Sequence, residues 1–234
     1  MSLLTVVRDV CSVVGVTAPT SVFSTLATNR TMQEMLSLAN EMAQRIAYDH
    51  REWTFLTKQA TLTGDGVKTA FDLPADFKRM LMSGNVWLST ASDTPMRFVP
   101  NSDEWMHRRA RNNSDGRGEW MMMGGQIHVW PALAAGAVAT FPYLSKNCVQ
   151  LFAGGFGDEF VTDGDTFVLG DRLLKLGMTW QWKAQKGSPY TEDLSSYGDA
   201  LLMAMGNDKP SPIIVGRQPT PVAARVAYPW PVPT

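Results

Sequence analysis

The sequence predicts an α+β protein, in which a helical bundle carries an inserted β-rich module and ends in an extended, proline-rich C-terminal arm. Apolar residues recur at helical spacing in residues 3–51 and 171–206, whereas strand patterns and turn residues dominate residues 58–145. Residues 207–234 hold seven of the fourteen prolines, and such a segment cannot join a packed bundle. The predicted units are the N-terminal bundle helices (1–57), the β-rich module (58–145), a connection with the C-terminal helical hairpin (146–206), and the arm (207–234).

The helix predicted over residues 171–186 carries two apolar stripes. One stripe has the spacing of three and four residues that suits a domain core, and the other lies about 100° around the helix and needs a second partner. The first stripe consists of Leu173, Leu176, Trp180 and Ala184, and the second of Leu174, Met178 and Trp182. We therefore expect the other elements to pack around this helix.

A short corner is predicted to join this helix to a second one. Gly187 suits the position just past a helix end, Ser188 is a suitable cap, and Pro189 is a suitable first residue for a helix over residues 189–206. The apolar face of this second helix is predicted to consist of Tyr190, Leu194, Tyr197, Leu201 and Met205. The two helices would form an αα-hairpin, which cannot bury its apolar faces alone.

Two further helices are predicted near the N-terminus. The first covers residues 3–14 and ends at Gly15. The second begins at a capping box formed by Thr31 and Glu34 and runs to about Arg51. Its inner face is predicted to consist of Met35, Leu38, Met42 and Ile46, with Ala39, Ala43 and Ala47 on a flank that another helix can approach closely.

Residues 58–145 contain the predicted strands. Residues 60–63 and 71–73 are predicted to form a hairpin around a turn at Gly64-Asp65-Gly66. Further extended stretches are predicted at residues 76–88, 96–99, 120–123, 126–130 and 137–143. Gly124 and Gly125 would form the turn between residues 120–123 and 126–130.

A short helix and a glycine-rich connection are also predicted. A brief basic helix from Asp103 to about Arg111 is predicted to be capped by Asn101 or Ser102. Residues 146–159, which include three glycines, are predicted to be a flexible connection back to the helical hairpin.

The composition describes an ordinary folded protein with almost no net charge. Apolar residues make up 44% and charged residues 18% of the 234 residues. The 21 Lys and Arg nearly balance the 22 Asp and Glu, for a formal net charge of −1, so nothing indicates a protein that holds DNA tightly. No stretch approaches the length of a membrane span, and Cys11 and Cys148 are predicted to be free thiols in a reducing compartment.

No metal site, cofactor or catalytic constellation is predicted. The histidines do not stand at the spacing of a metal pair, and the acidic residues after position 157 do not follow a calcium loop, so a solvated turn or a helix-entry charge is favoured. The residues concerned are His50, His107, His128, Asp158, Glu159, Asp163 and Asp165.

One neighbourhood combines basic and aromatic residues. It consists of Arg108, Arg109, Arg111 and Arg117 beside Trp105 and Trp120. Such a group can contact nucleic acid through phosphates and stacking, or it can be an exposed loop at a protein interface. The nearly neutral total charge favours the protein interface.

Several stretches carry a family resemblance. Near the C-terminus, residues 169–183 (LGDRLLKLGMTWQWK) follow Asp163 and Asp165 and precede residues 186–190 (KGSPY) and Tyr197. Upstream lie residues 38–47 (LANEMAQRIA), Trp53, Phe55-Leu56 and residues 73–80 (LPADFKRM). In content and order these stretches resemble the head-to-tail adaptor, or connector, proteins of tailed bacteriophages, across most of residues 30–206. Gly170 departs from the family pattern, which has proline before the aspartate.

The resemblance implies a structural virion protein rather than an enzyme. It implies a protein made in the host cytoplasm that forms a ring of twelve copies under the portal, at the head–tail junction, and extends the DNA channel. The implied partners are the portal protein, a tail or nozzle protein, neighbouring copies in the ring, and double-stranded DNA in passing; no membrane contact is implied. In this family the C-terminal segment commonly reaches onto the portal.

Two sets of site residues follow from the patterns and the resemblance together. The second stripe of the central helix, namely Leu174, Met178 and Trp182, is predicted to form the contact between subunits. Apolar side chains occur at intervals along the proline-rich arm. This pattern is typical of a segment that becomes ordered when it binds a partner. The predicted portal contacts are Ile213, Ile214, Val215, Arg217, Val222, Val226, Tyr228 and Trp230.

Two alternatives belong to other classes of protein. A virion-associated peptidoglycan hydrolase would need two carboxylates at a defined separation, with Glu104 and Asp115 as the candidates for acid and base. A plain DNA-binding module would show steeply salt-dependent binding, which the charge balance does not favour.

Overall fold

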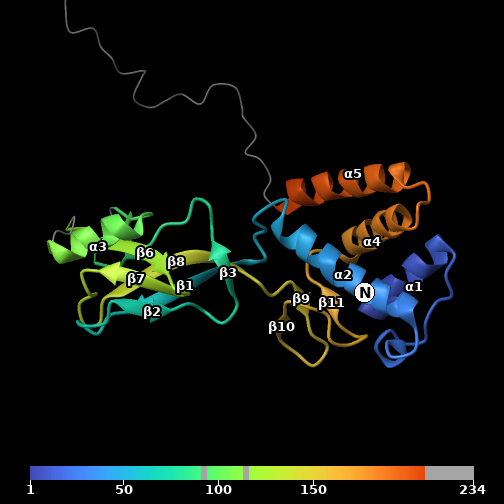
Figure 1. Ribbon diagram of the computed structural model, residues 1–234, viewed down its shortest axis with the longest axis horizontal. Coiled ribbons are helices and arrows are strands. Elements are labelled where there is room, and N and C mark those ends of the chain that lie inside the picture. The colour runs from blue at the N-terminus through green and yellow to red at the C-terminus, as the bar shows by residue number, and fades with distance from the viewer. Residues whose placement is uncertain (91–93, 113–115, 209–234) are drawn as a thin grey trace, which may run out of the picture.

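The computed structural model describes residues 1–90, 94–112 and 116–208, which form two bodies arranged along the long axis of the molecule (Figure 1). Four helices with a small sheet form one body, and two larger sheets with a short helix form the other. These helices and sheets confirm the predicted α+β class. The domain boundaries at residues 57/58, 145/146 and 206/207 remain a prediction from sequence.

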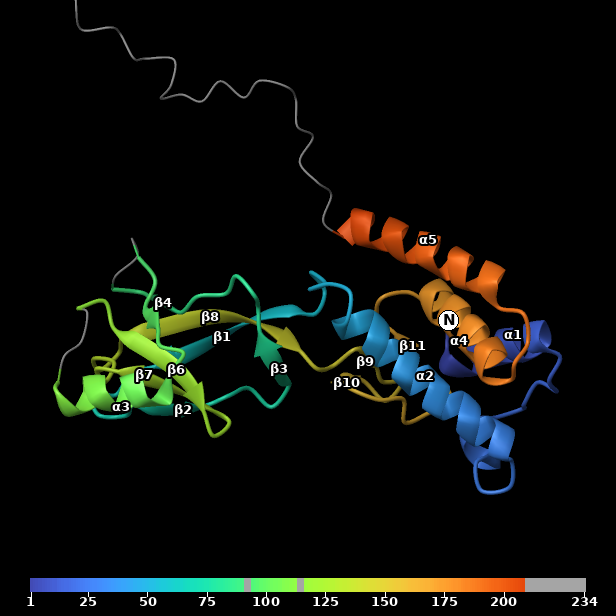
Figure 2. The same ribbon diagram turned by 45° about the horizontal axis from the view of Figure 1, so that its top comes forward.

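The helical body is built around one central helix. Its helices are α1 (Leu3–Val14), α2 (Arg30–Tyr48), α4 (Asp171–Gln185) and α5 (Thr191–Asp208), with the short 3-10 helix η1 (Phe23–Thr25) after α1. As expected, α4 is the central helix, because it packs against α1, α2 and α5 (Figure 2). Apolar side chains of α4 belong to a single continuous core together with those of α1, α2 and α5.

α1 begins and ends as predicted. The Thr5 N–H donates to Ser2 Oγ at 3.4 Å, so Ser2 is the N-cap. Gly15 follows the last turn with φ at 74°, a conformation that glycine adopts without the steric cost of a Cβ atom.

The capping box predicted for α2 is wrong. The N-cap is Asn29, whose Oδ1 accepts hydrogen bonds from the backbone N–H groups of Thr31 (3.0 Å) and Met32 (3.4 Å). Asparagine is at least as good an N-cap as threonine, and here it stands two residues earlier. Thr31 therefore lies inside the first turn, and Glu34 is available for an ion pair with Lys186.

The buried face of α2 agrees with the sequence pattern. Its predicted inner and flanking residues are all at most 4% exposed: Met35, Leu38, Ala39, Met42, Ala43, Ile46 and Ala47. The helix ends at Tyr48, three residues before the predicted end.

Three lysines link the central helix to its three neighbours. The pairs are Lys175 with Asp9 of α1 (2.9 Å), Lys183 with Asp193 of α5 (2.7 Å), and Lys186, just past α4, with Glu34 of α2 (2.7 Å). These side chains are partly exposed, so each pair contributes little to stability. The ion pairs mainly determine how each neighbouring helix is positioned against α4. The hydrophobic effect alone does not do this, because it does not depend on direction.

The corner between α4 and α5 differs from the prediction by two residues. Gly187 has φ at 70°, as expected past a helix end. Ser188, however, donates its N–H to the carbonyl of Lys183 (2.9 Å) and so belongs to the end of α4. α5 begins at Thr191 rather than at Pro189.

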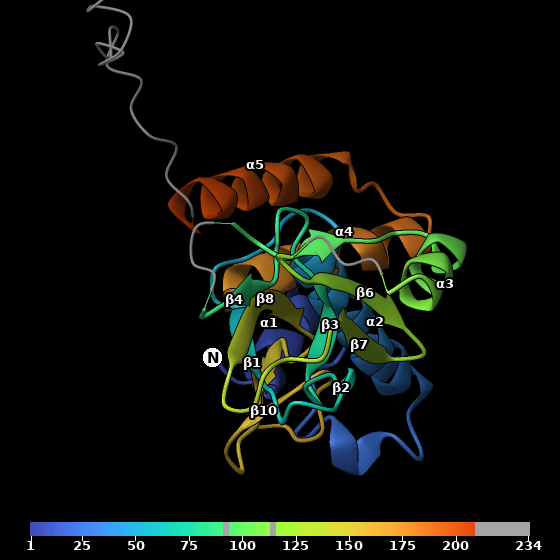
Figure 3. The same ribbon diagram turned by 90° about the vertical axis from the view of Figure 1, so that its left-hand side faces the viewer.

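The second body contains two four-stranded sheets that share one core. The first sheet has the order β1-β8-β3, with β4 also paired to β8; its strands are β1 (Thr57–Thr63), β8 (Val138–Ser145), β3 (Phe77–Met80) and β4 (Trp87–Leu88). The second has the order β2-β7-β6-β5, with β2 (Ala70–Asp72), β7 (Gln126–Trp130), β6 (Glu119–Met123) and β5 (Arg97–Phe98). Figure 3, a view along the long axis, places β1 and β8 on one side and β6 and β7 on the other. Side chains from both sheets, including Phe141 and Ile127, meet between them.

The hairpin predicted around Gly64-Asp65-Gly66 is wrong, although both of its strands exist. β1 pairs with β8, and β2 pairs with β7. The turn bonds to the connection between β7 and β8: Gly64 donates its N–H to Ala137 O (2.8 Å), and Gly66 donates to Leu133 O (2.9 Å). Two strands that are neighbours in sequence therefore enter different sheets, which local alternation does not reveal.

Other predictions for this body are confirmed. β6 and β7 form an antiparallel pair around Gly124 and Gly125, both with positive φ. Helix α3 (Ser102–Ala110) is capped by Asn101, whose Oδ1 accepts from the Asp103 N–H at 2.8 Å.

The glycine-rich connection is an ordered part of the described chain rather than a flexible linker. It forms a small sheet with the order β10-β9-β11, composed of β9 (Val149–Gln150), β10 (Phe156–Gly157) and β11 (Thr166–Phe167). Gly154 and Gly155, both with positive φ, form the turn between β9 and β10. Val149 and Phe167 belong to the core of the helical body, so this sheet packs beneath the helices.

Candidate assembly surfaces

The stripe predicted to join subunits lies in the core of the single chain. Leu174 is 1% exposed, Met178 is 0% exposed and Trp182 is 6% exposed. Side chains buried to this degree have no surface left for a neighbouring subunit, so the prediction requires correction. The second partner that this stripe needs is supplied within the chain, because α1, α2 and α5 surround α4 on several sides. The first stripe is less buried, since Leu176 and Trp180 are only partly covered.

The predicted inner face of α5 is only half correct. Tyr197 and Leu201 are buried, and Met205 is partly buried against the core. Tyr190 and Leu194 are 39% and 40% exposed. The later start of the helix leaves Tyr190 outside it, whereas Leu194 lies in its first turn and remains exposed.

The face of α5 that is turned away from the core, called the outer face below, carries exposed apolar residues. Leu202 is 68% exposed and Met203 is 67% exposed, although they are the next two residues after the buried Leu201. Successive helical residues are about 100° apart, so three adjacent apolar residues cannot all face one core. Asp199 lies one turn before them and is also exposed. Sequence reasoning missed this surface, although the unbroken run of six apolar residues from Ala200 to Met205 was a signal for it.

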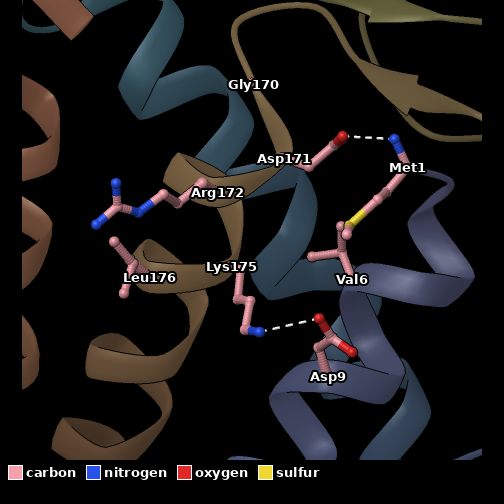
Figure 4. Close-up of a pocket in the computed structure, with 8 residues that line it drawn as sticks. All are labelled: Met1, Val6, Asp9, Gly170, Asp171, Arg172, Lys175 and Leu176. Atoms are coloured by element: carbon pink, nitrogen blue, oxygen red, sulfur yellow. Dashed lines mark hydrogen bonds and ion pairs between the residues drawn. The ribbon is translucent and has the colours of Figure 1, made fainter.

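An open groove of about 600 Å³ lies between α1 and the start of α4 (Figure 4). Two ion pairs join its walls: the Met1 ammonium lies 2.5 Å from Asp171 Oδ2, and Lys175 Nζ lies 2.9 Å from Asp9 Oδ2. Arg172 extends away from α1 and makes no ion pair with any other described residue. The groove therefore combines an apolar floor with a cation that is not neutralised by the described part of the chain.

Hydrogen bonds and an ion pair join the end of α5 to the segment that leads into β1. Both carboxylate oxygens of Asp208 accept from the Thr54 N–H (3.1 and 3.2 Å), and the Thr54 hydroxyl donates to the same carboxylate. Arg51 Nε lies 3.8 Å from Asp208 Oδ2, and its guanidinium also donates to the carbonyl of Met205. This contact joins positions 154 residues apart, and no local pattern in the sequence predicts it.

The predicted portal contacts fall in the segment that follows this anchored helix end. All eight lie outside the described residues: Ile213, Ile214, Val215, Arg217, Val222, Val226, Tyr228 and Trp230. The structure therefore fixes the position from which the segment departs, at Asp208.

The basic and aromatic neighbourhood is largely engaged in internal contacts. Trp105 and Trp120 are 1% and 4% exposed, so neither offers a stacking surface. Arg108 forms ion pairs with Glu104 (2.8 Å) and with the buried Glu119 (2.5 Å). A buried carboxylate requires such a partner, so Arg108 is a structural residue of this body.

The remaining arginines offer little charge to a nucleic acid. Arg109 lies over the Trp130 ring, with its guanidinium carbon 5.4 Å from the ring centroid. Arg111 and Arg117 are exposed. Arg109 is exposed as well, and three exposed cations make a small electrostatic footprint, since tight DNA binding neutralises several phosphates at once.

The acidic cluster before α4 organises the backbone. Asp165 is fully buried and accepts hydrogen bonds from the N–H groups of Val161 and Thr162 (both 2.6 Å) and of Phe152 (2.8 Å). Burial by itself raises the pKa of Asp165, but these hydrogen bonds and that of the Thr162 hydroxyl outweigh it and hold the pKa below its usual range. Asp163 accepts from the N–H of Val22 at 2.9 Å and so ties this loop to the segment after α1.

The carboxylate proposed for hydrolysis is also held in ion pairs. Glu104 lies 3.4 Å from Arg97 and 2.8 Å from Arg108, and its candidate partner Asp115 is outside the described residues. Within the described ranges, no group of three or more His, Cys, Asp or Glu side chains is arranged to hold a metal ion.

The two cysteines are free and buried, as expected. Burial raises the pKa of the Cys148 thiol to about 11, so it is protonated at neutral pH and is a poor nucleophile. None of the helices in the described part of the chain is both long enough and apolar enough to cross a membrane.

These features define a class of protein. An exposed apolar helix face, an open groove and an anchored helix end from which a proline-rich segment departs are the features of a structural subunit that binds other proteins. The family model of the SU10 adaptor protein matches residues 1–204. The chain belongs to this family of phage head-to-tail adaptors and is a structural adaptor protein of a phage virion. Comparison with curated proteins found none that matches.

Proposed function

We propose that copies of this chain form a ring under the portal, extend the DNA channel toward the tail and join the capsid to the tail, with no enzymatic step of their own. The observation that carries the proposal is the family match over residues 1–204, which covers both bodies of the fold. Family membership implies association with the portal and the tail in the virion. A ring of twelve copies is the arrangement implied by the family resemblance.

The segment after Asp208 is proposed to bind the portal. It contains Lys209, Arg217 and Arg225 but no Asp or Glu, and its apolar residues include Ile213-Ile214-Val215 and Trp230. A positively charged segment with several apolar side chains suits an acidic, partly apolar surface. The contacts of Asp208 with Thr54 and Arg51 support this role, because a fixed point of departure limits the positions that the segment can reach.

Two different surfaces of the helical body are proposed to join neighbouring copies. Contacts in a closed ring are heterologous, so each copy must offer two different complementary faces. The outer face of α5 offers Leu202 and Met203 beside Asp199, and the groove between α1 and α4 offers an apolar floor beside Arg172. Apolar and charge complementarity together support the pairing of these two faces.

Passage of DNA is proposed to involve weak contacts only. The formal net charge is −1, and Arg108, which stands in the most basic neighbourhood, is neutralised by Glu104 and Glu119. A channel that does not bind DNA tightly allows the genome to move through it.

Cosedimentation with purified portal rings of the same phage tests the proposal. The full chain should sediment with the portals, and Trp230→Asp should weaken the association at least tenfold, because a charge replaces an apolar anchor. Val67→Asp is a matched control, since Val67 is 82% exposed in the turn between β1 and β2. Failure of the unaltered chain to sediment with portals at any concentration would reject the adaptor role.

A further inference from the structure

β1 is an edge strand with one unpaired side. All seven of its residues pair with β8, from Thr57 opposite Leu144 to Thr63 opposite Val138. On its other side, no backbone hydrogen bond joins β1 to any of the described residues. β8, by contrast, is paired on both sides, with β1 on one and with β3 and β4 on the other.

The hydrogen bonds that flank β1 show which groups face the open side. Ser145 donates its N–H to Leu56 O (2.8 Å), and Gly64 donates to Ala137 O (2.8 Å). In an antiparallel pair every second residue bonds to the partner strand, so the even-numbered residues of β1 bond to β8. The N–H and C=O groups of Gln59, Thr61 and Thr63 therefore point to the open edge.

This edge lacks the usual protection against strand addition. Natural edge strands are commonly blocked by proline, by inward-facing charges or by a covering element. β1 contains no proline, and its one charged residue, Lys58, is paired with Asp76 at 2.7 Å. The side chains of Gln59, Thr61 and Thr63 are exposed, and threonine has a high preference for strands.

One segment of the chain has the composition of a matching strand. Residues 222–228 (VAARVAY) form a run of seven without proline, bounded by Pro221 and Pro229, and β1 also has seven residues. Proline has no N–H and cannot donate to a ladder, so the length of such a run limits the length of a strand. In a strand, Val222, Ala224, Val226 and Tyr228 would lie on one face, and Arg225 would lie on the other between two alanines.

The position of Asp208 brings this segment within reach. Its contact with Thr54 places the departure point three residues before β1 begins. The thirteen residues 209–221 can span roughly 40 Å at about 3 Å per residue, whereas β1 is about 23 Å long. We propose that Val222–Tyr228 adds to the open edge of β1 of the same chain as a further β-strand in the free subunit.

The pairing would conceal part of the segment that is proposed to bind the portal. Val222, Val226 and Tyr228 would have to leave β1 before they contact the portal, so strand release would accompany assembly. Only this consequence rests on the proposed function, because the pairing itself concerns the free subunit.

Amide hydrogen exchange of the full chain, followed residue by residue by NMR spectroscopy, tests the pairing. The N–H groups of Gln59, Thr61 and Thr63 should exchange slowly, as should those of Ala60 and Leu62, which already bond to β8. Arg225→Pro and Val226→Pro each remove one donor, and whichever donor faces β1, one of the two variants must break a ladder bond. In that variant the three outward amides should exchange at least tenfold faster, while Ala60 and Leu62 stay slow.

Thr220→Pro is the matched control, since it introduces proline outside the run and should leave all five amides slow. Rapid exchange of Gln59, Thr61 and Thr63 in the unaltered chain would show that the edge is open and overturn the proposal. Protection that is lost on dilution would assign the added strand to a second copy and overturn the assignment to the same chain. None of these outcomes depends on the portal, so they are separable from the cosedimentation result.

Discussion

Asp76 is the residue that joins β1, β3 and β8 at one point. Its carboxylate lies 2.7 Å from Lys58 Nζ and accepts hydrogen bonds from the hydroxyls of Tyr143 and Ser145, both at 2.8 Å. Burial raises the pKa of Asp76, but these three interactions outweigh it and lower the pKa to about 2. The carboxylate therefore stabilises the first sheet only while it is ionised.

Asp76→Asn tests this contribution through its pH dependence. The pKa of the folded state lies below the ordinary value, so the stabilisation is complete above about pH 4 and is lost as the pH falls toward 2. At pH 7 the substitution should lower the free energy of unfolding by about 2 kcal/mol, measured by urea denaturation. The difference from the unaltered chain should shrink between pH 4 and pH 2.

Asp72→Asn provides the control for that measurement. Asp72 is exposed and accepts one hydrogen bond from Gln126, so its replacement should change stability by less than about 0.5 kcal/mol. An effect of Asp76→Asn that is the same at pH 7 and pH 2.5 would contradict the role assigned to the charge.

Individual site residues were the hardest to predict from the sequence. The two stripes of α4 were recognised, but periodicity cannot tell a contact with the same chain from a contact with another subunit. Leu174, Met178 and Trp182 were therefore assigned to an interface, whereas the structure buries them in its own core. The anchoring of Asp208 by Thr54 was also beyond prediction, because it depends on the packing of elements far apart in sequence.

At the scale of elements, α4 and α5 provide a direct comparison. Met178 in α4 is 0% exposed and Met203 in α5 is 67% exposed. Met178→Ala should lower the free energy of unfolding by about 2–5 kcal/mol, because it removes buried apolar atoms and leaves a cavity. Met203→Ala should change it by less than about 0.5 kcal/mol, and urea denaturation of both variants measures the difference. Equal effects would contradict the assignment of α4 to the core.

Elements defined by local pattern were predicted well, and pairings were not. Helical periodicity and glycine ends located α1 and α4, and alternation around two glycines located β6 and β7. Whether β1 pairs with β2 or with β8 is decided by a partner more than seventy residues away and by backbone bonds from Gly64 and Gly66, which local alternation does not reveal. The small sheet of β9, β10 and β11 was missed because its strands have only two residues each.

For the whole molecule, the outer face of α5 is the surface proposed to join copies. Met203→Asp places a charge on this exposed face, so the chain should remain folded, with unchanged urea denaturation, but should fail to assemble beside its neighbours on the portal. Analytical ultracentrifugation of portal complexes should then show fewer bound copies. Val67→Asp, on an exposed turn of the other body, should leave the number of bound copies unchanged.

Charge reversal tests whether the groove between α1 and α4 contacts the outer face of α5 in the neighbouring copy. Arg172→Glu should weaken assembly, because it places a carboxylate opposite Asp199 of the neighbouring copy, and the combination with Asp199→Lys should restore it. Both residues are at the surface of the described structure, so neither change should unfold the chain. A double variant no better than the single ones would show that these two faces do not meet.

Electron microscopy of portal rings mixed with the purified chain is the most direct test of the central claim. We expect an additional annulus of twelve copies at one end of each portal, coaxial with its channel. Portals that remain bare at saturating concentrations of the chain would contradict the proposal that it is a ring-forming adaptor between the head and the tail.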